Sequence, residues 1–202
     1  PPKTVTLATG PAQSAYEEFG KRYQKALAVD GIDVVLLPSE GSSHNLQLLR
    51  DGQADVAFVQ GGTADLQPDD PDNLVSLGSL FVEPLWLFYR TDAAERMHNA
   101  PRLDSLRQLR GWRVNVGSEG SGVPTLIERL LQANKVEPGS VKLSRLEQTP
   151  ATVDFLAGRL DALVFASAPE SLMVQMLLQT PGVQLLDFAQ HEAYARRFPF
   201  LT

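Results

Sequence analysis

Short apolar runs and longer segments of helical spacing alternate along the first sixty residues. Leucine and β-branched residues fill the short runs, which is typical of strands buried in a sheet. In the longer segments apolar residues recur every three or four positions, and Ser42 or Ser43 is placed to cap the second of them. This pattern predicts strands over residues 4–8, 33–37 and 56–60, and helices over residues 13–29 and 42–50.

The same order of elements is expected again in the second half of the chain. A Gly-x-x-Asp step from a helix into a strand occurs at Gly52–Asp55 and again at Gly158–Asp161, 158 − 52 = 106 residues later. Because two different lobes would not need the same acid at the same junction, we interpret both aspartates as structural turn residues. The pattern predicts strands over residues 113–116, 141–145 and 162–165, and helices over residues 125–133 and 151–156.

A continuous apolar segment over residues 80–90 separates the two repeats. Its aromatic content predicts an extended strand that crosses between lobes and serves as the hinge. The expected fold class is α/β, with two similar Rossmann-like lobes. We expect a first lobe over residues 1–84, a second over 85–186, and over 187–202 the start of a crossover back to the first lobe. The rest of this return is expected in a C-terminal segment that is missing from this chain.

The loop Gly117–Gly122 is the strongest functional candidate in the sequence. It lies between a predicted strand and a predicted helix, so several backbone N–H groups and the Ser121 hydroxyl could face one anion. Val123 and Pro124 follow it where a nucleotide phosphate loop requires lysine, and its glycine spacing differs from a dinucleotide fingerprint. A tight turn without a ligand is the alternative interpretation. If the sheets are parallel, this loop joins others at the carboxyl ends of the strands, where ligands bind.

Five further polar residues have two interpretations each. Capping explains one of Ser42 and Ser43. For the hydroxyl of the other serine and the amide of Asn45, a structural role and a contact with a ligand are equally good interpretations. Gln60 ends an apolar strand, so its amide is expected to meet either a neighbouring loop or a solute. Glu119 would repel a carboxylate unless it points away or pairs with a ligand amine, and the second option fits an amino acid.

Composition excludes several classes of function. The 202 residues have a net charge of −6 and contain no basic run longer than Arg196-Arg197, so we expect no nucleic acid partner. No apolar run approaches the roughly 20 residues that cross a bilayer, so we expect no direct membrane insertion. Cysteine is absent, and His98 and His191 have no neighbour at metal-ligand spacing. We therefore expect no metal and no cofactor.

A series of short motifs spans nearly the whole chain. In order they are Ala8-Thr9-Gly10, Gly41-Ser42-Ser43-His44-Asn45-Leu46, Gly52-x-x-Asp55-x-Ala57-Phe58-Val59-Gln60, Glu83-Pro84-Leu85, Ser105-Leu106-x-x-Leu109-x-Gly111-x-Arg113-Val114, Gly117-x-x-Gly120-Ser121-Gly122 and Phe198-Pro199-Phe200. Each motif alone is weak, but together and in this order they are fairly specific. On these residues the chain resembles the TAXI family, the solute receptors of TRAP transporters.

The resemblance implies a type II periplasmic binding protein fold and a receptor without catalysis. Its location would be periplasmic or otherwise extracytoplasmic, with any membrane anchor supplied by segments outside this chain. The implied partners are a small anionic solute, namely an acidic amino acid or related organic acid, and membrane permease subunits. The same fold also serves as the ligand-sensing domain of membrane-anchored or transcriptional regulators, which is the alternative function. The residues implied to bind the solute are Thr9, Ser14, Ser42, Ser43, Asn45, Gln60, Gly120, Ser121 and Gly122.

Overall fold

The computed structural model describes residues 3–12, 14–63, 74–169 and 171–187. The chain divides into two compact units. The first comprises Pro1–Phe81 together with Glu119–Gly122, and the second comprises Val82–Ser118 together with Val123–Thr202. Each unit contains a sheet with helices packed on it, which confirms the α/β fold that the alternating pattern predicted.

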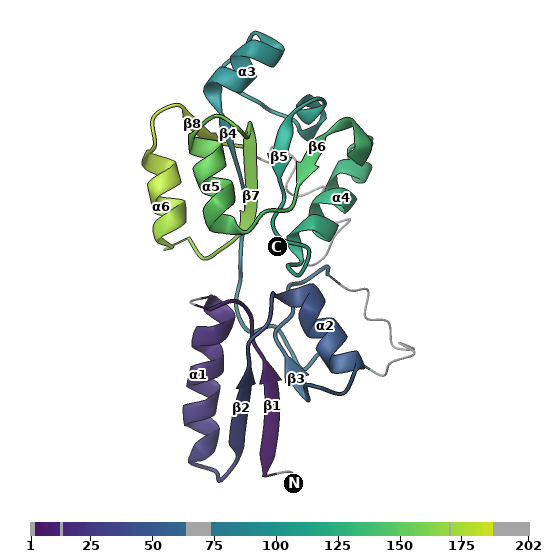
Figure 1. The fold of residues 1–202 in the computed structure, drawn as a ribbon, viewed down its shortest axis with the longest axis vertical. Helices are drawn as coiled ribbons and strands as arrows, with labels where there is room; N and C mark the ends of the chain where they lie inside the picture. Colours follow the sequence, from purple (N-terminus) through teal and green to yellow (C-terminus); the bar gives the residue numbers. More distant parts are fainter. Residues whose placement is uncertain (1–2, 13, 64–73, 170, 188–202) are drawn as a thin grey trace. The chain divides into compact units, whose positions relative to one another are not determined.

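The first unit is built on a three-stranded parallel sheet in the order β2–β1–β3 (Figure 1). Its strands β1 (Thr4–Ala8), β2 (Asp33–Leu37) and β3 (Val56–Ala57) alternate along the chain with helices α1 (Ala15–Ala28) and α2 (Ser42–Arg50). β1 and β2 pair along their whole length, from Thr4 opposite Asp33 to Ala8 opposite Leu37. Because all three strands are parallel, their carboxyl ends lie at one edge of the sheet.

Both faces of this small sheet are covered by apolar side chains. Leu7 of β1 packs with Val34 of β2 and with apolar residues of α1. The next residue, Ala8, belongs instead to a cluster with Leu48 of α2. Since successive residues of a strand point to opposite faces, the two helices cover opposite sides of the sheet.

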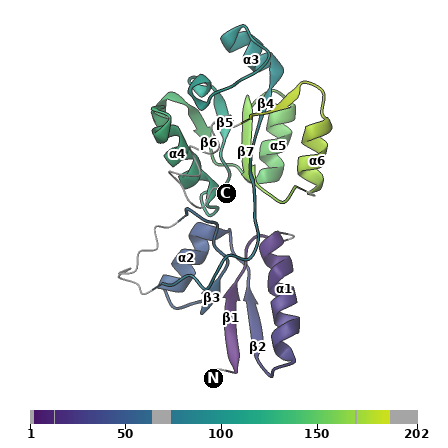
Figure 2. The same ribbon diagram turned by 180° about the vertical axis from the view of Figure 1, so that it is seen from behind.

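The second unit contains a five-stranded mixed sheet in the order β6–β5–β7–β4–β8. β5 (Arg113–Asn115) is parallel to β6 (Lys142–Ser144) and β7 (Ala162–Ala166), whereas β4 (Leu85–Arg90) is antiparallel to β7 and β8 (Val183–Leu185). The helices are α3 (Thr91–His98), α4 (Val123–Ala133), α5 (Gln148–Leu156) and α6 (Leu172–Gln179), with short 3-10 turns at Leu106–Leu109 and Pro138–Ser140. α5 and α6 lie side by side in both views (Figures 1 and 2).

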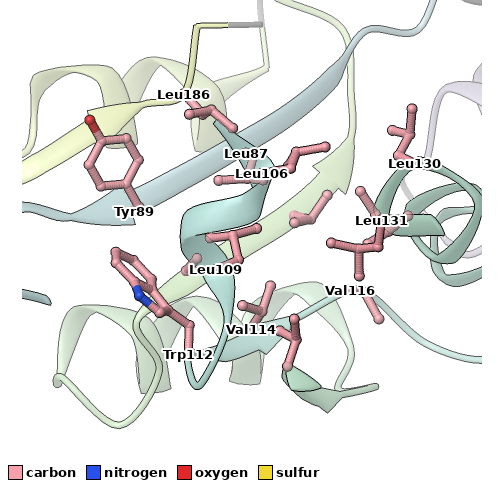
Figure 3. Close-up of a cluster of buried hydrophobic side chains, with 14 of the residues drawn as sticks. Leu87, Tyr89, Leu106, Leu109, Trp112, Val114, Val116, Leu130, Leu131 and Leu186 are labelled. Carbon is pink, nitrogen blue, oxygen red and sulfur yellow. The ribbon is translucent and has the colours of Figure 1, made fainter. Parts of the chain in front are cut away.

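The largest apolar cluster of the described residues belongs to this second unit. Leu87 and Tyr89 of β4 lie in it, and the Tyr89 ring contacts Trp112 (Figure 3). The Tyr89 hydroxyl accepts a hydrogen bond from the Leu103 N–H at 3.1 Å, so its polar end is satisfied within the core. Phe88, between the two, points to the opposite face and joins a separate cluster. β4 is therefore buried on both faces.

The repeated Gly-x-x-Asp step has the same structural role in both units. Asp55 Oδ2 accepts a hydrogen bond from the Thr6 N–H of β1 at 2.8 Å, and its own N–H donates to Thr6 O. Asp161 Oδ2 accepts from the Arg113 N–H of β5 at 2.9 Å, and its N–H donates to Arg113 O. Asp55 thus ties β3 to β1, and Asp161 ties β7 to β5, which agrees with the interpretation of both aspartates as structural.

Asp161 is more deeply engaged than Asp55. Its carboxylate also accepts hydrogen bonds from the side chains of Arg113, at 2.7 Å and 3.0 Å, and of Arg96, at 2.9 Å. Burial acts to raise the pKa of Asp161, but the side-chain and backbone hydrogen bonds from Arg113 outweigh it and leave the pKa below its usual range. Asp161 is therefore ionised in the folded protein at neutral pH.

The prediction that Ser42 or Ser43 caps the second helix is wrong. The N-cap is Gly41, which makes no side-chain capping bond and has φ 125°, a value that favours glycine. Both serines lie inside the helix, and their hydroxyls bond to other loops of the first unit. The helix covers Ser42–Arg50, so it ends where the pattern predicted.

The third strand of the first unit is shorter than predicted. β3 ends at Ala57, whereas residues 56–60 were expected to be extended strand. The reason is that side chains of α2 bond the backbone beyond Ala57. The Asn45 amide donates to Phe58 O at 2.7 Å, and the Gln60 N–H donates to Ser42 Oγ at 2.8 Å.

Residues 80–90 form a strand only in their second half. β4 begins at Leu85, and residues 80–84 have no regular structure. The role of this segment as a hinge stays a prediction. No prediction covered α3, α6 or β8. Apart from Asp187, the expected return segment over 187–202 lies outside the described residues, as does His191.

Candidate functional site

The nine residues proposed from the sequence as solute contacts all belong to the first unit. Six of them lie in or beside the loops that follow β1, β2 and β3. The other three, Gly120–Gly122, lie in a segment that belongs to this unit although it follows β5 in sequence. The geometry of the first unit therefore describes the whole predicted site.

Thr9 and Asn45 are buried and hold loops together. The Asn45 side chain is 0% exposed, and its Nδ2 donates to Thr9 O at 2.6 Å and to Phe58 O at 2.7 Å. Thr9 is 1% exposed, and its N–H and hydroxyl both donate to Leu37 O, at 2.9 Å and 3.3 Å. These bonds link the carboxyl ends of all three strands of the sheet.

Ser42 and Ser14 are also engaged within the protein. The Ser42 hydroxyl accepts the Gln60 N–H and shares a 3.3 Å hydrogen bond with the Tyr16 hydroxyl. Ser14 is the N-cap of α1, and its hydroxyl accepts the Glu17 N–H at 3.3 Å. Ser42 therefore positions the loop that contains Gln60, whereas Ser14 satisfies an otherwise unpaired donor at a helix start.

The first turn of α2 directs three donors at two oxygen atoms. The backbone N–H groups of Ser43 and His44 donate to Gly120 O, at 3.1 Å and 3.4 Å. The Ser43 hydroxyl donates to the neighbouring carbonyl, Ser121 O, at 3.1 Å. The helix N-terminus thus binds two acceptors, and in this structure both are peptide carbonyls.

Glycines at positions 120 and 122 permit a close approach of backbones in the first unit. A Cβ atom at Gly120 would overlap the Glu40 side chain. A Cβ atom at Gly122 would overlap the Thr63 hydroxyl and lie 2.9 Å from Gln60 Oε1. Any larger residue here would force these neighbours to move.

Two buried side-chain atoms lack a hydrogen-bond partner within the part of the chain that the structure describes. They are Asn45 Oδ1 and Thr63 Oγ1, and both belong to this edge of the first unit. Buried polar groups are nearly always paired with protein or with ordered water, so each orphan marks a place that takes a further partner.

The charged side chains of this edge are acidic. Glu40 and Glu119 are both exposed. The segments 9–12, 38–45, 58–63 and 119–122 contain neither lysine nor arginine. His44 Nδ1 accepts the Glu40 N–H at 3.2 Å, which makes Nδ1 an acceptor and leaves any ring proton on Nε2.

Away from the carboxyl ends of the first unit's strands, the titratable side chains show few features of a catalytic or metal site. In the second unit, burial raises the pKa of Glu83 above its usual range. His98 Nε2 lies 2.6 Å from Gln108 O and 3.3 Å from Trp112 Nε1, so this histidine is part of the packing. Over the residues that the structure covers, no group of three or more His, Cys, Asp or Glu could hold a metal ion.

The same described ranges contain no helix with the length and apolar character of a membrane span.

Sequence reasoning missed three residues of this edge. Tyr16 packs against the apolar cluster of the first unit, and its hydroxyl also bonds to Ser42. Thr63 and Glu40 were not proposed at all, although both contact the positions of missing Cβ atoms in Gly120–Gly122. The position of Thr63 in the sequence does not indicate that it belongs to this edge. Its contact is with Gly122, about sixty positions later in the chain.

Known structures with this fold include binding proteins and sensor domains. The alkanesulfonate-binding protein SsuA from Xanthomonas axonopodis pv. citri, bound to MOPS, aligns with TM-score 0.59 and 16% identity over 99% of this chain and 70% of its own. An amino acid ABC transporter substrate-binding protein from Streptococcus pneumoniae, bound to L-arginine, aligns with TM-score 0.55 and 16% identity over 91% of this chain and 74% of its own. The effector-binding domain of QuiR, in complex with shikimate, aligns with TM-score 0.56 and 15% identity over 93% of this chain and 81% of its own.

At these identities the likeness concerns the fold, which is that of type II periplasmic binding proteins. The predicted fold class is thereby confirmed. A family model matches residues 7–201, nearly the entire sequence. The chain belongs to the NMT1-like family.

Proposed function

We propose that this protein is an extracytoplasmic receptor for a small carboxylated solute, an acidic amino acid or related organic acid. It would hand the solute to the permease subunits of a TRAP-type transporter, as the resemblance of its motifs to the TAXI family implies. The fold and the membership of the NMT1-like family support a binding function. The proposal assigns no catalytic residue, metal or cofactor.

The observation that carries the proposal is the set of three donors in the first turn of α2. Ser43 N, Ser43 Oγ and His44 N converge on two oxygen atoms, and a carboxylate presents two oxygen atoms of the same kind. A carboxylate on these donors would replace the carbonyls of Gly120 and Ser121. Charge favours that exchange, because hydrogen bonds to an anion are roughly twice as strong as neutral ones and a helix N-terminus adds about 0.3–1 kcal/mol.

The acidic side chains of this edge narrow the class of solute. Glu40 and Glu119 would repel a solute with two carboxylates, and the adjoining loops offer no lysine or arginine to balance it. A solute that also has an ammonium group would pair with these glutamates. We therefore place amino acids ahead of dicarboxylic acids within the proposed class.

Calorimetric and thermal titration with L-glutamate, L-aspartate and succinate tests the proposal. A receptor at a solute concentration of 100 times its dissociation constant gains about 2.7 kcal/mol of stability, which is a shift that a thermal scan resolves. We expect the amino acids to raise the melting temperature more than succinate does. The Ser43→Ala variant should lose most of the shift. The proposed ligand class is wrong if none of the three acids has an effect at millimolar concentration.

A second candidate function is ligand sensing by a membrane-anchored or transcriptional regulator. The match to the effector-binding domain of QuiR favours it, since that domain shares the fold and binds a small carboxylated molecule, shikimate. The two functions differ in their partners rather than in the solute site. Purification of the native protein from membranes and from the soluble fraction would separate them, because a receptor should associate with permease subunits and a regulator with DNA or a signalling domain.

A further inference from the structure

We infer that Asn45 is a positioning residue, which sets the geometry of the proposed carboxylate donors without touching the solute. The role of Asn45 toward the solute rests on the proposed function. Its role in holding the loops of the first unit together does not. Sequence reasoning placed Asn45 among the residues that contact the solute. Its side chain is instead 0% exposed, and both hydrogens of its amide are used inside the first unit.

The Asn45 amide closes the sheet at the point where strand pairing ends. β1 and β3 pair only as far as Ala8 opposite Ala57, and the Phe58 N–H makes one further bond to Ala8 O. Beyond it lie the carbonyls Thr9 O and Phe58 O, and among the described residues neither accepts a backbone N–H of the other segment. Asn45 Nδ2 donates to both, at 2.6 Å and 2.7 Å, and so holds the two chain segments together.

The same face of α2 makes a second attachment to the loop after β3. Ser42 precedes Asn45 by three positions, so the two side chains lie on one side of the helix. Ser42 Oγ accepts the Gln60 N–H at 2.8 Å. Attachment at two points one turn apart fixes both the position and the rotation of the helix start. The direction of the three donors on Ser43 and His44 follows from that fixed orientation.

A buried asparagine in the second unit provides a contrast. Asn115 Oδ1 accepts the Leu146 N–H at 2.8 Å and the Ser144 hydroxyl at 3.1 Å, while its Nδ2 donates to Leu146 O. Asn45 Oδ1, in contrast, has no partner in the described part of the chain. Its amide nitrogen places two donors on one atom, which neither Asp nor Ser nor Leu can supply.

Nuclear magnetic resonance tests the clamp in the unmodified protein. Hydrogen-bond scalar couplings from Asn45 Nδ2 to the carbonyl carbons of Thr9 and Phe58 should be present, and they should persist when L-glutamate is added to saturation. Loss of both couplings on adding L-glutamate would overturn the inference, since it would mean that the amide turns to the solute. Absence of the couplings in the free protein would overturn it as well.

Substitution supplies the functional arm of the test. In Asn45→Asp the two donors are lost, so the carbonyl carbon signals of Thr9 and Phe58 should move upfield and L-glutamate should bind at least tenfold more weakly. Asp55→Ala is the matched control, because it removes the acceptor of the Thr6 N–H on the same strand β1, away from the carboxyl edge. It should lower the melting temperature but leave the dissociation constant unchanged. Wild-type affinity in Asn45→Asp would refute the positioning role.

The outcomes separate the two proposals. If the wild-type protein binds no acid, the proposed ligand class fails while the couplings still decide whether Asn45 clamps the loops. If Asn45→Asp does not fold, the couplings in the wild-type protein, with and without L-glutamate, decide alone.

Discussion

Gly122 gives the sharpest prediction, because the space around it is defined by two side chains. A Cβ atom at this position would overlap Thr63 Oγ1 and lie 2.9 Å from Gln60 Oε1. Ordinary contacts of this kind begin at 3.4 Å, so Gln60 alone would have to retreat by 3.4 − 2.9 = 0.5 Å. Thr63 Oγ1 is buried, which limits its freedom to turn away. Overpacking of this kind costs about 1–3 kcal/mol.

The change to make is therefore Gly122→Ala, compared with Gly139→Ala as a control. An added Cβ at Gly139 meets nothing within 4 Å. That variant should be neutral or about 0.4–1 kcal/mol more stable, because alanine restricts the unfolded chain. Urea denaturation measures both free energies of unfolding. For a chain of this size we expect Gly122→Ala to lower the melting temperature by roughly 2–12 °C.

The refuting result is equal stability of the two alanine variants. It would mean that the segment 119–122 does not lie against Gln60 and Thr63 in solution, and the donors of Ser43 and His44 would then lack the carbonyls of Gly120 and Ser121 as acceptors. A lower free energy of unfolding in Gly122→Ala alone would support the packing of the first unit, including residues 119–122.

Three further predictions concern stability. Ser42→Ala should cost about 1–3 kcal/mol in urea denaturation, because the Gln60 N–H loses its acceptor, and a loss below 0.5 kcal/mol would contradict this. Leu87→Ala should cost about 2–5 kcal/mol by opening a cavity in the core of the second unit, and an unchanged melting temperature would be inconsistent with that burial. Asp161→Asn should lose the stability that ionised Asp161 derives from Arg113. Because the folded pKa of Asp161 is lowered, this contribution is fully present above the unfolded pKa of about 3.9 and disappears as the pH falls through the folded value. The difference in free energy of unfolding between wild type and Asp161→Asn should therefore shrink below about pH 4, and a constant difference would exclude this mechanism.

Most of the elements could be predicted because they depend on local pattern. The strands over Thr4–Ala8 and Asp33–Leu37 begin and end where the apolar runs do, and Gly52 and Gly158 mark the same helix ends in both repeats. The short strand β8 and helix α6 escaped prediction, since Leu172–Gln179 has apolar residues all round and Val183–Leu185 is only three residues long.

The candidate site was harder to predict because its bonds cross long stretches of sequence. Ser42, Ser43 and Asn45 attract notice in the sequence because capping accounts for at most one of the two serines, although the N-cap in the structure is Gly41. Their tasks could not be read from the sequence, because each is set by a partner 13 to 78 positions away, such as Phe58 for Asn45 and Ser121 for Ser43. Whether the solute contacts are those named from the sequence stays a prediction for the titrations above.

The bonds from the first turn of α2 to Gly120 and Ser121 have a consequence for biosynthesis. The ribosome synthesises Ser42–Arg50 long before residue 120. During that interval the start of α2 has no native acceptors for its N–H groups. Water or an anion must accept these hydrogen bonds in the meantime. The first unit therefore reaches its final form only after part of the second has been translated, although nearly all of its residues are made first.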